Sequence, residues 1–406
     1  MDARRAIESV FRIEQPKLIA GLARITRDVG VAEELAQDAM VTALEQWPTT
    51  GIPDRPGAWL MQAAKHRAID HVRRDRMKER KHLEIVAPVD TSADAIAEQL
   101  DDELGDDLLR LIFTACHPVL PKDARVALTL RMVGGLSSDE IARAFLVPLQ
   151  TMQQRIVRAK KQLTDAQVPY EVPTGEALAP RLESVLEVIY LIFNEGYTAT
   201  RGEDWTRPEL CEDALRLGRI LASRAPDLAE VHGLVALMEI QASRFAARTG
   251  PNGEIIRLLD QNRARWDALL IRRGLDALAK ATRLGGGVYT LQAAIAACHA
   301  RAKAAAETDW TRIAALYAEL MKLTPSPIVE LNRAVAVGMA DGPAAGLAIV
   351  DTLAKPLDGY YLFPSVRGDF LEKLGRLDEA RAEFTRAADL TSNAKERELL
   401  LGRARG

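Results

Sequence analysis

Residues 120–163 read LPKDARVALTLRMVGGLSSDEIARAFLVPLQTMQQRIVRAKKQL, and this stretch indicates the fold more clearly than any other. Apolar residues recur at every third or fourth position, which is typical of amphipathic helices. Gly134 and its glycine neighbour end the first helix. Ser137 or Ser138 caps a short second helix, and Pro148 suits the first turn of a third. This order predicts a helix-turn-helix, whose second helix enters the major groove of DNA.

The third helix of this stretch has an outer face that is polar and carries no acidic residue. Its helical spacing directs four residues toward the core: Met152, Ile156, Ala159 and Leu163. Four others are left facing outward: Gln153, Gln154, Arg155 and Arg158. Gln pairs with adenine and Arg with guanine, whereas Lys160 and Lys161 suit phosphates. Two surface helices of an ordinary bundle are the structural alternative.

Two helices are expected earlier in the chain, and their charges are opposite. AEELAQDAMVTALEQW (32–47), which Pro48 ends, has an apolar side and an acidic side. The acidic side is either a solvated surface or a docking face for a basic partner. PGAWLMQAAKHRAIDHVRRDR (56–76) carries Lys and Arg opposite its apolar stripe. Cations spaced along one helix match the phosphates of a nucleic acid, although surface helices often carry such charge.

Charge also divides the 406 residues into parts. Residues 55–81 hold nine Lys or Arg against three acids, whereas residues 90–107 hold eight acids and no Lys or Arg. A run of one sign with few apolar residues does not fold alone, so it is predicted to be a tether. We expect four parts: 1–86, an acidic linker at 87–107, 108–168, and a long Ala/Leu-rich extension at 169–406. Strand signals are nearly absent, so the predicted fold class is all-α.

Composition excludes several classes of protein. The net charge of −3 excludes a protein that coats nucleic acid through bulk positive charge, and no apolar run approaches the length of a membrane span. The three cysteines are isolated and fit a cytoplasmic location. The pairs Cys116-His117 and Cys298-His299 lack zinc-site spacing. We therefore expect no catalytic residues, metal or cofactor, and no enzyme activity.

The ordered set of these segments resembles the extracytoplasmic-function (group IV) sigma factors of bacterial RNA polymerase. The acidic helix resembles regions 2.1–2.2, the basic helix resembles regions 2.3–2.4, and residues 120–163 resemble region 4. The resemblance implies contacts with core RNA polymerase and with the −10 and −35 elements of promoter DNA. The residues that match those regions are Glu33, Glu34, Leu35, Gln37, Asp38 and Glu45 for polymerase; Lys65, His66, Arg67, Arg73, Arg74, Arg76 and Arg80 for the −10 element; and Gln150, Thr151, Gln153, Gln154, Arg155, Arg158, Lys160 and Lys161 for the −35 element.

Two departures from the family pattern affect the promoter sequence. His66 stands where the family often has Asn, at the position associated with a flipped −10 base. Gln153 and Gln154 replace a more usual basic or small pair at the start of the reading helix. The promoter sequence is therefore not transferable from relatives.

The extension resembles one subfamily that carries a tetratricopeptide-like C-terminal domain. Segments such as YLIFNEGYTA (190–199), DQNRARWD (260–267) and LQAAIAACHA (291–300) carry this resemblance. Gly368, Phe384 and their neighbours Ala380 and Ala387 occupy packing positions of a 34-residue repeat. Stacked helix pairs suit binding, so the extension is expected to hold a protein partner or to dock within the chain and to regulate the sigma factor.

The sequence leaves one rival function from another class. A free-standing helix-turn-helix regulator with a protein-binding repeat domain explains residues 120–163 and the extension equally well. It leaves the acidic face of residues 33–47 and the separate basic helix unexplained.

Overall fold

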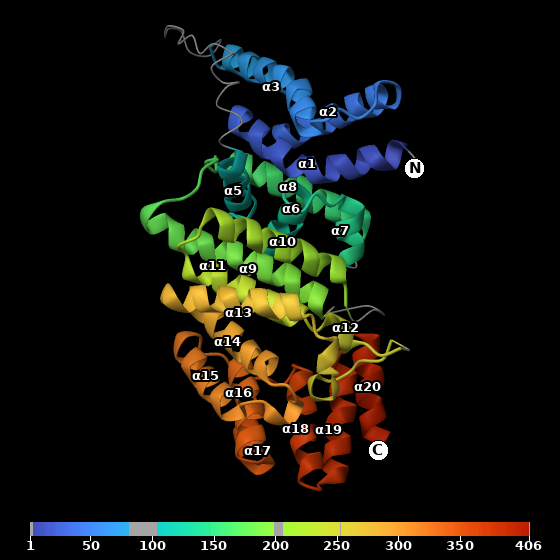
Figure 1. Cartoon of the computed structure of the whole chain (residues 1–406), viewed down its shortest axis with the longest axis vertical. Coiled ribbons are helices and arrows are strands. Elements are labelled where there is room, and N and C mark those ends of the chain that lie inside the picture. The colour runs from blue at the N-terminus through green and yellow to red at the C-terminus, as the bar shows by residue number, and fades with distance from the viewer. Residues whose placement is uncertain (1–2, 81–103, 146, 199–205, 252, 406) are drawn as a thin grey trace. The chain divides into compact units, whose positions relative to one another are not determined.

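The computed structural model describes residues 3–80, 104–145, 147–198, 206–251 and 253–405 (Figure 1). Helices make up nearly all of the regular structure in these ranges, and an isolated antiparallel bridge joins Thr249 to Ile255. The all-α prediction is confirmed. The chain forms two compact units, residues 1–191 and residues 192–406. None of the described helices is long and apolar enough to cross a membrane.

The first unit begins with three helices that pack on one another, α1 (Ala3–Thr26), α2 (Val29–Thr50) and α3 (Pro56–Arg80). Their core includes Leu22, Ala36 and Leu60, each fully buried. Trp47 and Trp59 meet edge to face, with ring centroids 5.2 Å apart, and this contact joins α2 to α3.

Pro48 does not end α2, contrary to the sequence prediction. The helix continues to Thr50 and closes at Gly51, whose N–H bonds to the Trp47 carbonyl at 2.9 Å. Gly51 has a φ of 82°, a left-handed conformation that glycine adopts without a steric penalty. Pro48 has no N–H to donate to the Leu44 carbonyl, and the helix ends two residues later.

Four helices follow the undescribed segment: α5 (Leu104–Ala115), α6 (Lys122–Met132), α7 (Ser138–Ala144) and α8 (Leu149–Asp165). The last four positions of the expected linker, 104–107, thus lie in α5, and the remainder at 87–103 lies outside the described residues. Ser137, not Ser138, caps α7. Its hydroxyl accepts from the Glu140 N–H at 3.1 Å while Glu140 accepts from the Ser137 N–H at 2.7 Å, which is a capping box.

The helix α8 packs on α6 and α7 through the apolar stripe that its sequence predicts. The buried residues of α8 are Met152, Ile156, Ala159 and Leu163. The prediction of a helix-turn-helix core is confirmed.

Residues 169–191 belong to the same compact unit as these helices. The Tyr170 hydroxyl lies 2.9 Å from the Ala20 carbonyl in α1 and 2.8 Å from the Asp107 carbonyl in α5. Farther along, α9 (Leu178–Tyr197) contributes Arg181, which donates to the Phe113 carbonyl at 2.8 Å. These contacts attach the start of the expected extension to the first unit.

The second unit continues with α10 (Pro208–Arg224), α11 (Ala229–Ala242) and α12 (Phe245–Arg248). The helix α11 is buried along most of its length between α10, α13 (Ala268–Arg283) and α14 (Val288–Arg301). Glu230 of α11 accepts hydrogen bonds from the Tyr289 and Thr290 N–H groups, at 2.7 and 3.1 Å, and so caps the start of α14.

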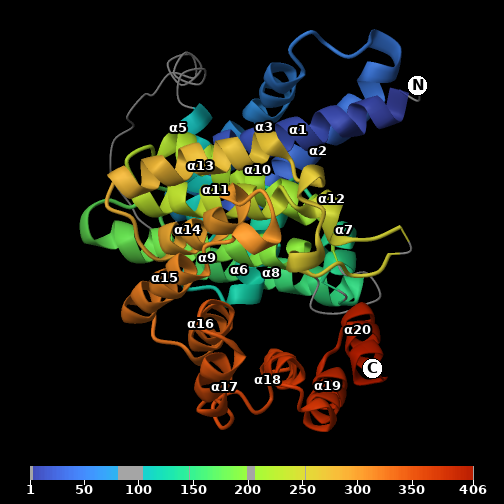
Figure 2. The same ribbon diagram turned by 60° about the horizontal axis from the view of Figure 1, so that its bottom comes forward.

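The remaining helices follow one another in chain order (Figures 1 and 2). They are α15 (Trp310–Leu323), α16 (Pro327–Ala340), α17 (Pro343–Asp351), α18 (Leu362–Lys373), α19 (Leu377–Leu390) and α20 (Ala394–Arg405), and each packs against the next.

Glycines allow these helices to approach one another closely. Gly338 and Gly346 lie against the Phe370 ring, and a Cβ added at either position would lie within 2.5 Å of that ring. Gly368 holds the same relation to Phe384, which is 1% exposed. The small and aromatic positions that the sequence analysis identified thus lie together in the core.

Candidate functional site

The exposed face of α8 carries most of the predicted −35 residues. Gln150, Thr151, Gln153, Gln154, Arg158 and Lys161 are all exposed. Arg155 turns partly toward α6 and pairs with Asp123 at 3.6 Å, with 27% of its side chain exposed. The helix therefore presents a continuous stripe of amides and cations, which are the groups that pair with base edges and phosphates.

Val157 lies in the middle of this stripe and was not identified from the sequence. It is 63% exposed, although it is apolar and β-branched. Helical spacing places it four residues after Gln153, three after Gln154 and four before Lys161. The signal was present in the sequence, because Val157 does not share the phase of the core stripe through Met152 and Ile156.

The described part of α3 exposes the first predicted −10 residues. His66, Arg67 and Arg73 are exposed and Lys65 is half-buried. Arg67 forms an ion pair with Asp38 of α2 at 3.2 Å, and both side chains are more than half exposed. Such a surface pair contributes little to stability. The side chains of Arg74, Arg76 and Arg80 lie outside the described residues.

The predicted polymerase residues of α2 separate into an exposed and a buried set. Glu34, Gln37, Asp38 and Glu45 are exposed, and the apolar Val41, at 54% exposure, lies among them. Leu35 instead belongs to the core, at 9% exposure. Helical spacing in the sequence predicts Val41 as part of the apolar stripe of residues 32–47, with Leu35 and Ala39. That prediction is wrong, because Val41 is exposed while Leu35 and Ala39 are buried.

Glu33 is the least exposed of the predicted polymerase residues, at 1%. Its Oε1 accepts from Arg131 Nε of α6 at 2.6 Å and from Gln37 Nε2 at 3.0 Å. Its Oε2 pairs with Lys160 of α8. The structure thus joins one predicted polymerase residue to one predicted −35 residue. No local sequence signal marks Arg131 as a second partner of Glu33.

In the second unit, residues from several of the family-like segments gather around three arginines. Arg248 stacks on the Tyr197 ring, with Cζ 3.5 Å from the ring centroid, and Arg263 stacks on Trp266 at 4.8 Å. Arg244 lies over both rings, 5.7 Å from Tyr197 and 5.9 Å from Trp266. These contacts are cation–π interactions that connect α9, α12 and the loop before α13.

Of the two cysteine–histidine pairs, Cys298 and His299 lie in α14, whereas Cys116 and His117 follow the last residue of α5. Burial raises the pKa of Cys116 to about 12, and its Sγ lies 3.2 Å from Thr129 Oγ1. Burial, together with the charges of Arg244 and Arg263, lowers the pKa of His299 to about 4, so its ring is neutral at pH 7. Among the described residues, no group of three His, Cys, Asp or Glu could hold a metal ion.

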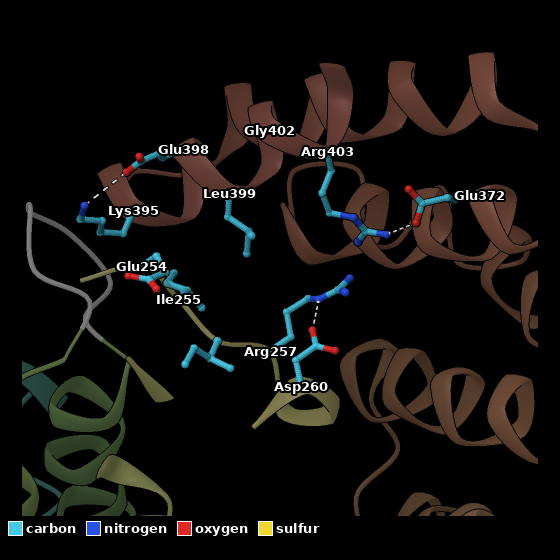
Figure 3. A pocket seen from close by; sticks show the side chains of 11 residues that line it. Glu254, Ile255, Arg257, Asp260, Glu372, Lys395, Glu398, Leu399, Gly402 and Arg403 are labelled. Carbon is cyan, nitrogen blue, oxygen red and sulfur yellow. Dashed lines mark hydrogen bonds and ion pairs between the residues drawn. The ribbon is translucent and has the colours of Figure 1, made fainter. Parts of the chain in front are cut away.

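A groove of about 640 Å³ also lies in the second unit, between residues 254–260 and helix α20. The charged side chains along its walls form pairs, as Figure 3 shows for Arg257 with Asp260, Lys395 with Glu398 and Arg403 with Glu372. Ile255 and Leu399 add apolar surface.

Comparison with known proteins supplies the family. Residues 10–77 match the family described as Sigma-70 region 2, and residues 110–163 match Sigma-70, region 4. A protein of Mycobacterium ulcerans (strain Agy99), named ECF RNA polymerase sigma factor SigK, is 31% identical over 147 residues, which cover 35% of this chain and 75% of that protein. Its namesake in Mycobacterium tuberculosis (strain ATCC 25618 / H37Rv) is 30% identical over 145 residues, 34% of this chain and 74% of that protein.

The chain belongs to the extracytoplasmic-function sigma factors. This sigma factor carries an additional C-terminal domain, because residues 181–282 match a family of unknown function, DUF6596. An uncharacterized protein of Rhizobium meliloti (strain 1021) is 43% identical over 385 residues, 94% of this chain and 91% of that protein. The extension is therefore shared by a second protein of nearly the same length.

Proposed function

We propose that this sigma factor directs core RNA polymerase to a restricted set of promoters, reading the −10 element with α3 and the −35 element with α8. The observation that carries the proposal is the exposed stripe of α8 from Gln150 to Lys161, which offers amides and cations without an acidic residue. Amides and guanidinium groups distinguish bases in the major groove, and lysines hold the phosphates. The helix α3 likewise exposes two cations, Arg67 and Arg73, which suit contacts with the second promoter element, the −10 element.

The exposed face of α2 supports polymerase as the partner. An apolar residue, Val41, lies among the acidic Glu34, Asp38 and Glu45. An apolar centre with a charged rim is typical of protein interfaces, and its acidic charge fits a basic helical partner. The relatives named ECF RNA polymerase sigma factor agree with this partner.

The helical extension is proposed to regulate the sigma factor by binding protein. Helices α15 to α20 each pack on the next, so they build a continuous surface of the kind that repeat proteins use for binding. The groove lined by Ile255 and Leu399 lies on this unit. We propose a protein segment, either of a partner or of this chain, as what the extension binds.

The double substitution Arg73→Ala with Arg74→Ala tests the −10 assignment. We expect run-off transcription from a cognate promoter to fall by about tenfold or more, because two phosphate or base contacts are lost, while polymerase is still bound. A matched control replaces two exposed arginines of the second unit, Arg265→Ala with Arg272→Ala, and leaves transcription unchanged. An unchanged transcript from the first variant would contradict the assignment.

Polymerase binding distinguishes the sigma-factor function from the rival function, a free-standing helix-turn-helix regulator. Only a sigma factor requires the α2 face to capture core polymerase. We expect the full chain to retain polymerase in a pull-down, and Glu34→Lys with Glu45→Lys to abolish that capture by charge reversal. If the unaltered chain binds operator DNA but captures no polymerase, the rival is favoured.

A further inference from the structure

A buried ionic contact joins the α2 helix of region 2 to the helices α6 and α8 of region 4. Its centre is the Glu33 carboxylate, which receives the Arg131 guanidinium at 2.6 Å and the Lys160 ammonium. The Arg131 and Lys160 side chains are only 18% and 21% exposed. We call Glu33, Arg131 and Lys160 the Glu33 clasp.

A second contact lies beside the clasp. Asp28 caps α2, and its Oδ1 accepts from the Gly30 and Val31 N–H groups at 2.7 and 3.0 Å. Its other oxygen, Oδ2, accepts from Thr164 Oγ1 of α8 at 2.8 Å. One carboxylate therefore starts the acidic helix and holds the end of the DNA-reading helix.

The chemistry of the clasp makes it an all-or-none contact. A carboxylate withdrawn from water is tolerated while cations compensate it, and it becomes unfavourable when one cation leaves. Glu33 regains full hydration only when region 4 moves away as a whole. Two separated states are therefore favoured over a gradual loosening.

We propose that the Glu33 clasp is an autoinhibitory contact, in which region 4 covers Glu33, one of the predicted polymerase residues of α2. This proposal rests on the proposed function. Within the clasp, Glu33 of the predicted polymerase face and Lys160 of the predicted −35 helix are each other's partners, so neither reaches an external one. Polymerase and region 4 compete for Glu33, and binding of polymerase releases region 4 toward the promoter.

The backbone geometry permits a direct test by cross-linking. A Cβ built at Gly30 lies 3.8 Å from the Lys160 Cβ. This separation lies within the range of about 3.5–4.5 Å found in disulfides. The variant Gly30→Cys with Lys160→Cys in the full chain should therefore lock the clasp on oxidation. The native thiols of Cys116 and Cys211 are buried and that of Cys298 is half-buried, so oxidised single variants also control for cross-links through Cys298.

The test compares binding of core polymerase to the oxidised and the reduced double variant. We expect the oxidised form to bind about tenfold more weakly or worse, and a reducing agent to restore binding. The single variants Gly30→Cys and Lys160→Cys, treated with the same oxidant, control for the loss of the lysine and for crowding of the Asp28 cap. Equal binding of the oxidised and reduced forms would overturn the proposal.

A second variant tests the clasp without touching the predicted DNA or polymerase residues. Arg131→Ala removes one cation from Glu33, and we expect it to raise polymerase affinity by about threefold or more. The matched control is Arg143→Ala, an exposed arginine of region 4 that pairs only with Asp139 in its own helix among the described residues. A lower affinity for Arg131→Ala would overturn the inhibitory role. Failure of the proposed function gives a different result, because the reduced and unaltered proteins would then bind no polymerase at all.

Discussion

At the scale of single residues, neighbouring side chains of similar chemistry differ in how far they are exposed to solvent. Glu33 and Glu34 are neighbours on one helix, yet the first is buried against two cations and the second faces solvent. Val157 and Ile156 differ in the same way on α8. A helical wheel predicts the second contrast because it depends on the helix alone. It does not predict the first, because that contrast depends on Arg131, 98 residues away.

Val157 leads to a prediction about the −35 sequence. An exposed aliphatic side chain amid groove-reading amides suits the methyl group of thymine. Removing one buried methyl costs about 0.8 kcal/mol, a factor of about four in affinity. We expect uracil in place of one particular −35 thymine to lower binding of the wild type by that factor, and to leave the Val157→Ala variant unaffected.

The measurement is promoter binding by the holoenzyme on templates with single thymine-to-uracil replacements. Leu323→Ala, at an exposed apolar position of α15, is the control and should retain the wild-type sensitivity to uracil. Equal sensitivity in Val157→Ala would remove Val157 from base recognition.

At the scale of the helix, caps decide where the recognition elements begin. The sequence left Ser137 and Ser138 as equal candidates for the cap of α7, and only the capping box with Glu140 distinguishes them. The periodicity of α8 predicted its core residues correctly because four positions of one helix determine it. The continuation of α2 past Pro48 was not predictable from the local rule, since the rule concerns helix interiors and Pro48 lies in a last turn.

Substitution of the cap should loosen α7. Ser137→Ala removes the side-chain acceptor of the Glu140 N–H, which typically costs about 1 kcal/mol. That amount raises the population of open states about fivefold. We expect amide hydrogen exchange in residues 139–142 to accelerate accordingly, as followed by mass spectrometry. Ser138→Ala lies one position further and should exchange as the wild type does.

At the scale of the whole molecule, the division into units does not coincide with the division by family resemblance. The expected extension starts at residue 169, whereas residues 169–191 lie in the first compact unit. Composition reveals a change of segment at the prolines that follow residue 168, but it does not reveal which unit a segment joins. Tyr170 joins residues 169–191 to the first unit, because its hydroxyl contacts backbone carbonyls 63 and 150 residues earlier in the chain.

Tyr170 should therefore stabilise the first unit out of proportion to its size. Tyr170→Phe keeps the ring and deletes the hydroxyl that lies between the Ala20 and Asp107 carbonyls, so a buried hydrogen bond is lost. The expected loss is about 1–2 kcal/mol of unfolding free energy. A lower urea midpoint for the first unit measures it. Tyr360→Phe, in the second unit, is the matched control and should leave that midpoint in place.

The glycines of the second unit have a consequence for homologous chains. Gly338 and Gly346 leave space for one aromatic ring, that of Phe370, and neither position admits a side chain while the ring is present. Evolutionary change at the three positions is thereby coupled: a relative that loses the ring is free to gain methyl groups at the other two, and one that keeps it is not. Covariation among these three columns would record, across species, how closely the helices approach.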